Sequence, residues 1–176
     1  CPNDANFTFT LPVMEIPLVK LRLKDGAWES VPNGSLTLER KHQIGNFADF
    51  CNDCGNCDVF CPEEGGPYRI KPRFFGSEAG WRERPDLDGF FVERTGALVR
   101  MLGRIQRHEY GMEWEAGQVV YSGSDFSVRF EESDPAATVT GPGPAEVDLT
   151  FAFIMDRIRR GVLASSGVNY INCLME

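Results

Sequence analysis

Four cysteines that fall within eleven residues constrain this chain more than any other feature of its sequence. They are Cys51, Cys54, Cys57 and Cys61, the last followed by Pro62, in the spacing C-x2-C-x2-C-x3-C-P. This is the spacing of a ligand run for a [4Fe–4S] cluster. Cysteines at i, i+3 and i+6 allow one loop to wrap a cuboid cluster and bind three of its irons. Gly55 can take backbone angles that bring amide donors close to the sulfurs.

The alternatives for these thiols are a disulfide framework and a zinc site. Residues three apart in a tight loop rarely pair with each other, and only Cys1 and Cys173 are left as distant partners. Zinc usually takes two pairs of ligands from two separate knuckles, whereas this run has three thiolates on one turn before a Cys-Pro pair. The run therefore favours iron–sulfur over zinc.

The iron left open by the first three cysteines of the run requires a distant ligand. In two-cluster proteins the fourth cysteine of each run ligates the other cluster, so we expect Cys61 to belong to a second cluster. We expect Cys1 to complete the first one. The opening Cys1-Pro2, without an initiator Met, reads as the end of an upstream cysteine run, and the other ligands of the second cluster are expected there. The alternative distant donors are Cys173, His42 and His108.

The composition is that of a globular protein with an acidic balance. The chain has 176 residues, with 18 Lys and Arg against 26 Asp and Glu, and its formal net charge is −8. Few basic residues are present to neutralise phosphates, which argues against nucleic acid as a partner. No apolar run approaches the roughly 20 residues that cross a bilayer, and no signal peptide is recognisable, so we expect no membrane partner. Reduced cysteines and an oxygen-sensitive cluster favour the cytoplasm.

The hydrophobic pattern predicts an α+β fold in two units. Residues 1–80 are expected to form a ferredoxin-like [4Fe–4S] half with an inserted β-meander of three strands. Alternating residues predict strands at 7–11, 19–24, 27–31 and 36–40, with turns at Asp25-Gly26 and Asn33-Gly34. A closing strand is expected at 68–75.

Residues 81–176 are expected to form a β-rich extension that ends in a helix. Short strands are predicted at 90–92, 118–121, 126–130 and 138–140, while 97–110 fits a helix or a strand and 76–88 fits a loop. An apolar stripe at intervals of three and four predicts a helix at 145–163, made of Val147, Phe151, Ile154, Ile158 and Val162. Acidic residues in its first turn and arginines in its last suit the helix dipole. The arginines of the last turn are Arg157, Arg159 and Arg160. Their alternative role is to dock onto an acidic surface or to bind an anion.

The cysteine run lies in an acidic stretch. Between positions 43 and 68 there is no Lys or Arg, and the acidic residues are Asp49, Asp53, Asp58, Glu63 and Glu64. A solvated loop is one interpretation. The other is that this charge lowers the potential of the cluster and steers a basic partner toward it. Phe50, Val59 and Phe60 are expected to shield the cluster from water or to belong to the core.

The cysteine run also carries a family resemblance. The segments Ala48 to Cys57, Phe60 to Pro62 and Gly66 to Tyr68 resemble the C-terminal cluster region of the YgfK family of selenate reductase-like proteins. These are large flavin and iron–sulfur proteins related to the small subunit of glutamate synthase. The opening residues 1–6 are similar to the end of that family's preceding cluster motif. The resemblance is dense over 1–6 and 48–71 and thin beyond residue 95.

This resemblance implies FAD- and NAD(P)-binding domains ahead of the chain, from which clusters relay electrons. The positions that carry over are Cys1, Cys51, Cys54, Cys57 and Cys61. We therefore expect an electron-transfer domain of a larger NAD(P)H- and flavin-dependent oxidoreductase, with no catalytic residue of its own. Its expected partners are the upstream domains and an electron-acceptor protein.

Two other hypotheses remain open. One is a structural cluster that holds a protein-interaction module together. The other is a substrate pocket in the extension, lined by Trp114, Tyr121 or Arg129. The sequence contains no dinucleotide-binding, P-loop or nucleophile-elbow motif that would add chemistry of its own.

Overall fold

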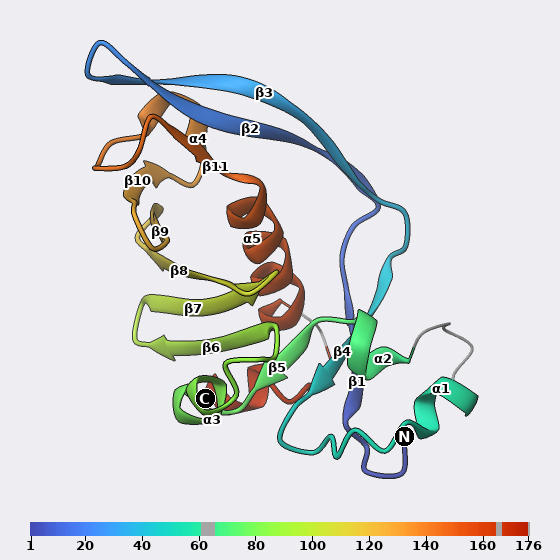
Figure 1. Ribbon diagram of the computed structural model, residues 1–176. Coiled ribbons are helices and arrows are strands. Elements are labelled where there is room, and N and C mark those ends of the chain that lie inside the picture. Colours follow the sequence, from blue (N-terminus) through green and yellow to red (C-terminus); the bar gives the residue numbers. More distant parts are fainter. Residues whose placement is uncertain (61–65, 165–166, 176) are drawn as a thin grey trace.

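The computed structural model describes residues 1–60, 66–164 and 167–175, and it consists of two sheets and one long helix (Figure 1). The larger sheet has eight described strands in the order β1-β4-β5-β6-β7-β8-β9-β10. These are β1 (Asn6–Thr10), β4 (His42–Phe47), β5 (Arg73–Phe75), β6 (Gly89–Thr95), β7 (Leu98–Ile105), β8 (His108–Glu115), β9 (Gln118–Ser122) and β10 (Ser127–Glu131). The smaller sheet has the order β11-β2-β3, with β2 (Met14–Lys24), β3 (Ala27–Leu38) and β11 (Glu146–Asp148). The helices are α1 (Asn56–Phe60), α2 (Pro67–Ile70), α3 (Glu78–Glu83), α4 (Pro135–Thr138), α5 (Thr150–Leu163) and the 3-10 helix η1 (Asn172–Met175).

Consecutive antiparallel hairpins build the part of the large sheet from β6 to β10. Alternate side chains are buried along β9 and β10, as expected for strands with one face against a core. The predicted strands at 90–92, 118–121 and 126–130 are confirmed, and the ambiguous stretch 97–110 consists of strand β7 and the start of β8. The strand predicted at 138–140 is wrong. Residues Pro135–Thr138 form helix α4, and Thr140 makes only an isolated bridge with Arg129.

The smaller sheet carries a long hairpin, which projects from one end of the molecule (Figure 1). Its turn at Asp25-Gly26 is confirmed, and both residues have positive φ angles of 51° and 82°. The predicted third strand is wrong, because β3 continues unbroken past Asn33-Gly34 to Leu38. Asn33-Gly34 lies in a β-bulge, because the pairing of β3 with β2 shifts by one residue between Pro17 and Val19. Gly34 takes a φ of 83° in this bulge.

The large sheet contains two parallel pairings, which lie between its antiparallel ones. Strands β4, β5 and β6 are parallel neighbours, so the chain must cross over between them. The first crossover contains the cysteine run with α1 and α2, and the second contains α3. The closing strand predicted at 68–75 is therefore reduced to Arg73–Phe75, and the loop predicted at 76–88 contains a helix. The pairing of β5 with β6 continues the sheet across position 80, where a boundary between two units was expected.

Helix α5 covers one face of the large sheet (Figure 1). Met155 and Val162 are fully buried against the sheet, and Ile158 is nearly so. The predicted start of this helix is wrong, because Glu146–Asp148 pair with β2 as strand β11 and the helix begins at Thr150. Across the residues that the structure describes, none of the helices combines the length and apolar character needed to span a bilayer.

Candidate metal centre

Strands β1 and β4 bring the two parts of the expected cluster site to the same end of the large sheet. They pair antiparallel, and the N–H of Phe47 donates to the carbonyl of Ala5 at 2.7 Å. Residues 1–5 therefore lead into β1 at the end where residues 48–60 leave β4. Cys1 and Cys51 each lie four residues from this hydrogen bond.

Tight turns keep both cysteines near that end. The N–H of Asp4 donates to the carbonyl of Cys1 at 3.3 Å, and Asp4 has a φ of 54°. On the other segment, the N–H of Cys51 donates to the carbonyl of Ala48 at 3.2 Å. Bonds of this i to i+3 type bring the Cα atoms that they span within about 7 Å. Neither cysteine can therefore extend far from the end of its strand.

The loop that follows Cys51 is tightly wound. Asp53 and Gly55 both have left-handed φ angles, of 50° and 75°, as the sequence predicted for the glycine. Helix α1 then begins at Asn56, so Cys57 lies in its first turn. The thiols of Cys51 and Cys57 are half-buried, and those of Cys54 and Cys1 are exposed. Cys61 lies outside the described residues, as do Glu63 and Glu64 of the acidic stretch.

Asp53 connects the cysteine loop to the sheet. Its Oδ1 accepts a hydrogen bond from the Cys51 thiol, with an S–O distance of 3.4 Å, and lies 3.3 Å from Nη2 of Arg73. The Arg73 side chain, in β5, is only 8% exposed. The loop has no basic residue in its own sequence, but the fold supplies one from the next strand. Asp49 is also held by the fold, since its carboxylate accepts from the N–H of Gly76 at 3.2 Å.

The apolar residues of the loop are exposed to different extents. Val59 and Phe60 are 75% and 82% exposed. Phe50 packs edge-on against Phe47 and Tyr170, with ring centroids 5.1 Å and 5.2 Å apart. The interpretation of Val59 and Phe60 as core residues is wrong.

The candidate donors of the site are thiols. The described cysteines are all free thiols, and left-handed residues separate the first three cysteines of the run. Over residues 1–60, 66–164 and 167–175, no three side chains of His, Cys, Asp or Glu lie close enough together to hold one metal ion. A bound cluster would thus require the thiols of the loop to turn toward a common centre.

Sequence reasoning missed Tyr170, which joins the two halves of the site. Its hydroxyl donates to the carbonyl of Asp4 at 2.7 Å, and its ring packs against Phe47 and Phe50. Burial, together with the nearby Asp4 carboxylate, raises the pKa of this phenol. No sequence pattern marked this tyrosine, because its partners are more than 100 positions away along the chain.

The alternative distant donors differ in their positions. His42 is exposed at the opposite end of β4 from Cys51, and His108 is exposed at the start of β8. Cys173 is connected to the site by Tyr170. Its thiol donates to the carbonyl of Tyr170 at 3.5 Å, and the Tyr170 ring packs against Phe50. Of the three, Cys173 is therefore the donor that the fold places nearest to the cysteine loop.

The residues suggested for a substrate pocket do not converge. Trp114 lines a pocket of about 230 Å³ under α5, and neither Tyr121 nor Arg129 contributes to it. Tyr121 is fully buried and Arg129 is exposed on β10.

Arg160, from the arginine cluster at the end of α5, pairs with Glu132 at 2.8 Å and with Asp156 at 2.8 Å, which accounts for its charge without a further partner.

Comparisons with known proteins give a distant match. The chain is 27% identical over 101 residues to the protein named "Putative oxidoreductase YgfK" of Escherichia coli strain K12, and equally to that of E. coli O157:H7. The match covers 57% of this chain and 7% of each relative, so the chain spans a small part of the length of these curated relatives. No family model and no solved structure matches. The chain is thus distantly similar to an oxidoreductase.

Proposed function

We propose that the chain is an electron-transfer unit that holds a [4Fe–4S] cluster. Its ligands are Cys51, Cys54, Cys57 and Cys1, and Cys61 serves a second cluster. The observation that carries this proposal is the hydrogen bond between Phe47 and Ala5, since it puts Cys1 and the cysteine run at the same end of the sheet. The spacing of the run supplies the chemistry.

The surrounding residues have positioning and electrostatic roles. When bound, the cluster accepts and releases single electrons. Asp53 and Arg73 fix the start of the loop, and the buried guanidinium supplies a positive charge close to Cys51. Positive charge beside an anionic centre favours its reduced state, and it opposes the effect of the neighbouring carboxylates.

We further propose that this unit works within a larger NAD(P)H- and flavin-dependent oxidoreductase in the cytoplasm. The distant match to an oxidoreductase supports this assignment. FAD- and NAD(P)-binding domains of the same protein deliver the electrons, and an acceptor protein receives them. Neither nucleic acid nor membrane is required as a partner.

The test is anaerobic reconstitution of the chain with iron and sulfide. We expect about four irons and four sulfides per chain, and an EPR signal after reduction that is typical of [4Fe–4S]⁺. Zinc bound at the expense of iron would overturn the proposal.

Two matched variants test the distant ligand. Cys1→Ser is expected to lower the iron content or to change the EPR signal, whereas Cys173→Ser is expected to leave both unchanged. The reverse result would assign the open iron to Cys173, which lies against the same site through Tyr170. Full assembly in both variants would contradict either assignment.

A structural cluster in a protein-interaction module is the second candidate. The exposed Val59 and Phe60 on α1 favour it, because exposed apolar residues mark protein contacts. A redox titration separates the two candidates. An electron carrier cycles reversibly between two states, whereas a cluster with a purely structural role shows no reversible couple in the range of biological reductants.

A further inference from the structure

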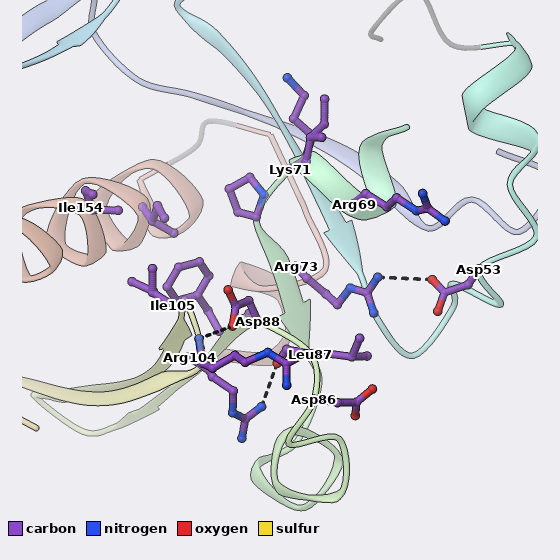
Figure 2. A pocket seen from close by; sticks show the side chains of 16 residues that line it. Asp53, Arg69, Lys71, Arg73, Asp86, Leu87, Asp88, Arg104, Ile105 and Ile154 are labelled. Carbon is purple, nitrogen blue, oxygen red and sulfur yellow. Dashed lines mark hydrogen bonds and ion pairs between the residues drawn. The ribbon is translucent and has the colours of Figure 1, made fainter. Parts of the chain in front are cut away.

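One pocket in the described part of the chain lies directly beside the cysteine loop. Its volume is about 750 Å³, within the range of small-molecule sites. Its walls come from Asp53 in the cysteine loop and from four further segments of the fold (Figure 2). They are the connection from α2 into β5, the loop before β6, the turn between β7 and β8, and one side of α5.

Two of these walls are held rigidly by charged residues. Arg104 is 2% exposed, and its guanidinium donates to the carbonyls of Arg84 at 3.0 Å and Leu87 at 2.9 Å. The carboxylate of Asp88 accepts from the N–H groups of Gln106 at 2.7 Å and Arg107 at 3.0 Å. The loop before β6 and the β7–β8 turn are thus tied together, so this part of the pocket exists before any ligand binds.

The lining is basic although the whole chain is acidic. Among the described residues that line the pocket, five side chains are basic and three are acidic, whereas the chain as a whole has a net charge of −8. The acidic ones are Asp53, Asp86 and Asp88, and the basic ones are Arg69, Lys71, Arg73, Arg104 and Arg107. Arg69 and Arg107 are exposed and Lys71 is half-buried, so these three lie where a ligand can reach them. A positive site of this kind attracts anions.

The remaining lining is apolar. Phe90 and Ile158 are buried beneath the pocket, and Ile105 and Ile154 are half-buried beside them. An inorganic anion would leave this surface uncovered. A ligand with an apolar or aromatic body would bury it while its charged group meets the basic side chains.

We propose that this pocket binds a small organic anion, with an apolar or aromatic body and a phosphate or carboxylate group. The pocket and the cysteine loop share Asp53, which lines the pocket and accepts a hydrogen bond from the Cys51 thiol at 3.4 Å. A ligand in the pocket therefore lies next to the proposed electron-transfer centre. The binding itself needs no cluster and stands or falls separately from the function proposed above.

Four probes with related structures test the ligand class by isothermal titration calorimetry. They are 1-naphthyl phosphate, 1-naphthoate, uncharged 1-naphthol and inorganic phosphate. At least one of the two aromatic anions is expected to bind about tenfold or more tightly than both 1-naphthol and phosphate, because it alone uses both parts of the lining. The stronger of the two anions distinguishes a phosphate ester from a carboxylate. Equal binding of all four, or no binding, would overturn the proposal.

Single-charge variants locate the binding. Arg107→Gln and Lys71→Gln are expected to weaken the binding of the better anion by about 3- to 10-fold each. Arg129→Gln removes one exposed charge on β10, outside this pocket, and is the control. An equal loss in the control would show that only the net charge matters, and the proposal would be wrong.

Nuclear magnetic resonance provides a readout that is independent of affinity. The amide signals of residues 86–89 and 104–107 are expected to shift when the anion is added to the cluster-free chain. The calorimetry is then repeated with the reconstituted chain. Anion binding without cluster assembly would support this inference and contradict the proposed function, and cluster assembly without binding would do the opposite.

Discussion

Tyr170 holds the turn that contains Cys1 against the cysteine loop. Replacing it with phenylalanine removes the hydrogen bond to the Asp4 carbonyl but keeps the ring packed against Phe47 and Phe50. We expect Tyr170→Phe to lower the free energy of unfolding by about 1 kcal/mol, measured by urea denaturation. Tyr110→Phe removes a hydroxyl outside this contact and is the control. An equal effect of both substitutions would mean that the bond to Asp4 contributes nothing specific.

Tyr121 makes stability depend on pH in the alkaline range. It is fully buried, and its hydroxyl has no hydrogen-bond partner among the described residues. Burial, with smaller contributions from Tyr110 and Asp148, raises its pKa well above the ordinary value of 10.0. The folded protein therefore keeps this proton at a pH where the unfolded chain loses it.

The expected result is a loss of stability as the pH rises above about 10, by about 1.4 kcal/mol per pH unit for this tyrosine. Below pH 10 the phenol is neutral in both states and contributes no slope. Tyr121→Phe should flatten the slope by that amount in urea unfolding at pH 8 to 11. An unchanged slope would show that the phenol ionises as easily in the folded chain as in the unfolded one.

The sequence indicated candidate donors for the site but not the residues around them. Cysteine spacing needs no knowledge of the fold, so the run and the left-handed Gly55 were accessible from the sequence. Arg73 and Tyr170 were not, because each reaches the loop through strand pairing and packing between distant segments. The acidic stretch between positions 43 and 68 is partly neutralised in the folded chain, because Arg73 pairs with Asp53.

At the scale of elements, Gly161 in α5 determines how closely the helix approaches β1. A β-carbon at this position would lie 2.7 Å from Cδ2 of Phe9 and 2.9 Å from Cδ2 of Leu11. Alanine favours a helix over glycine by about 1 kcal/mol, but overpacking a buried contact costs about 1–3 kcal/mol. We expect Gly161→Ala to destabilise the protein by about 1 kcal/mol in urea unfolding.

A double-mutant cycle tests the reason for this loss. Phe9→Leu makes room at the contact, so the loss caused by Gly161→Ala should be smaller in that background. If the losses of unfolding free energy caused by the two substitutions simply add, the contact with Phe9 is not the reason for the effect of Gly161→Ala.

The elements were predictable where a local pattern determined them. Alternation identified β1 and the second half of β2, and β6, β9 and β10 were recognisable as short strand candidates. The Asp25-Gly26 turn was correct because its positive φ angles suit those residues. Asn33-Gly34 has the same local signal, yet β2 pairs along the whole length of β3 and absorbs the glycine in a bulge. Val147 fits the helical stripe of α5 but is recruited by β2 into a strand. In both cases pairing with a distant segment outweighs local preference.

At the scale of the whole molecule, the continuous large sheet predicts cooperative unfolding. The sheet runs from β1 to β10 without a break, and one helix packs against both halves. We expect the amide signals of Phe9 and Val128, near the two ends of the sheet, to disappear at the same urea concentration. Two separate midpoints would instead show that residues 1–80 and 81–176 unfold as independent units.

The crossover between β4 and β5 has a consequence for how such a protein can evolve. The connection joins two strands that each pair with a further strand. Strand β4 also pairs with β1, and β5 also pairs with β6. The N–H of Ala48 also donates to the carbonyl of Phe74 at 2.7 Å, which closes the base of the connection. The register of the sheet therefore does not depend on the length or composition of the segment between them. The cysteine segment can be exchanged as a cassette, and related proteins can carry a different segment at this position on an unchanged scaffold.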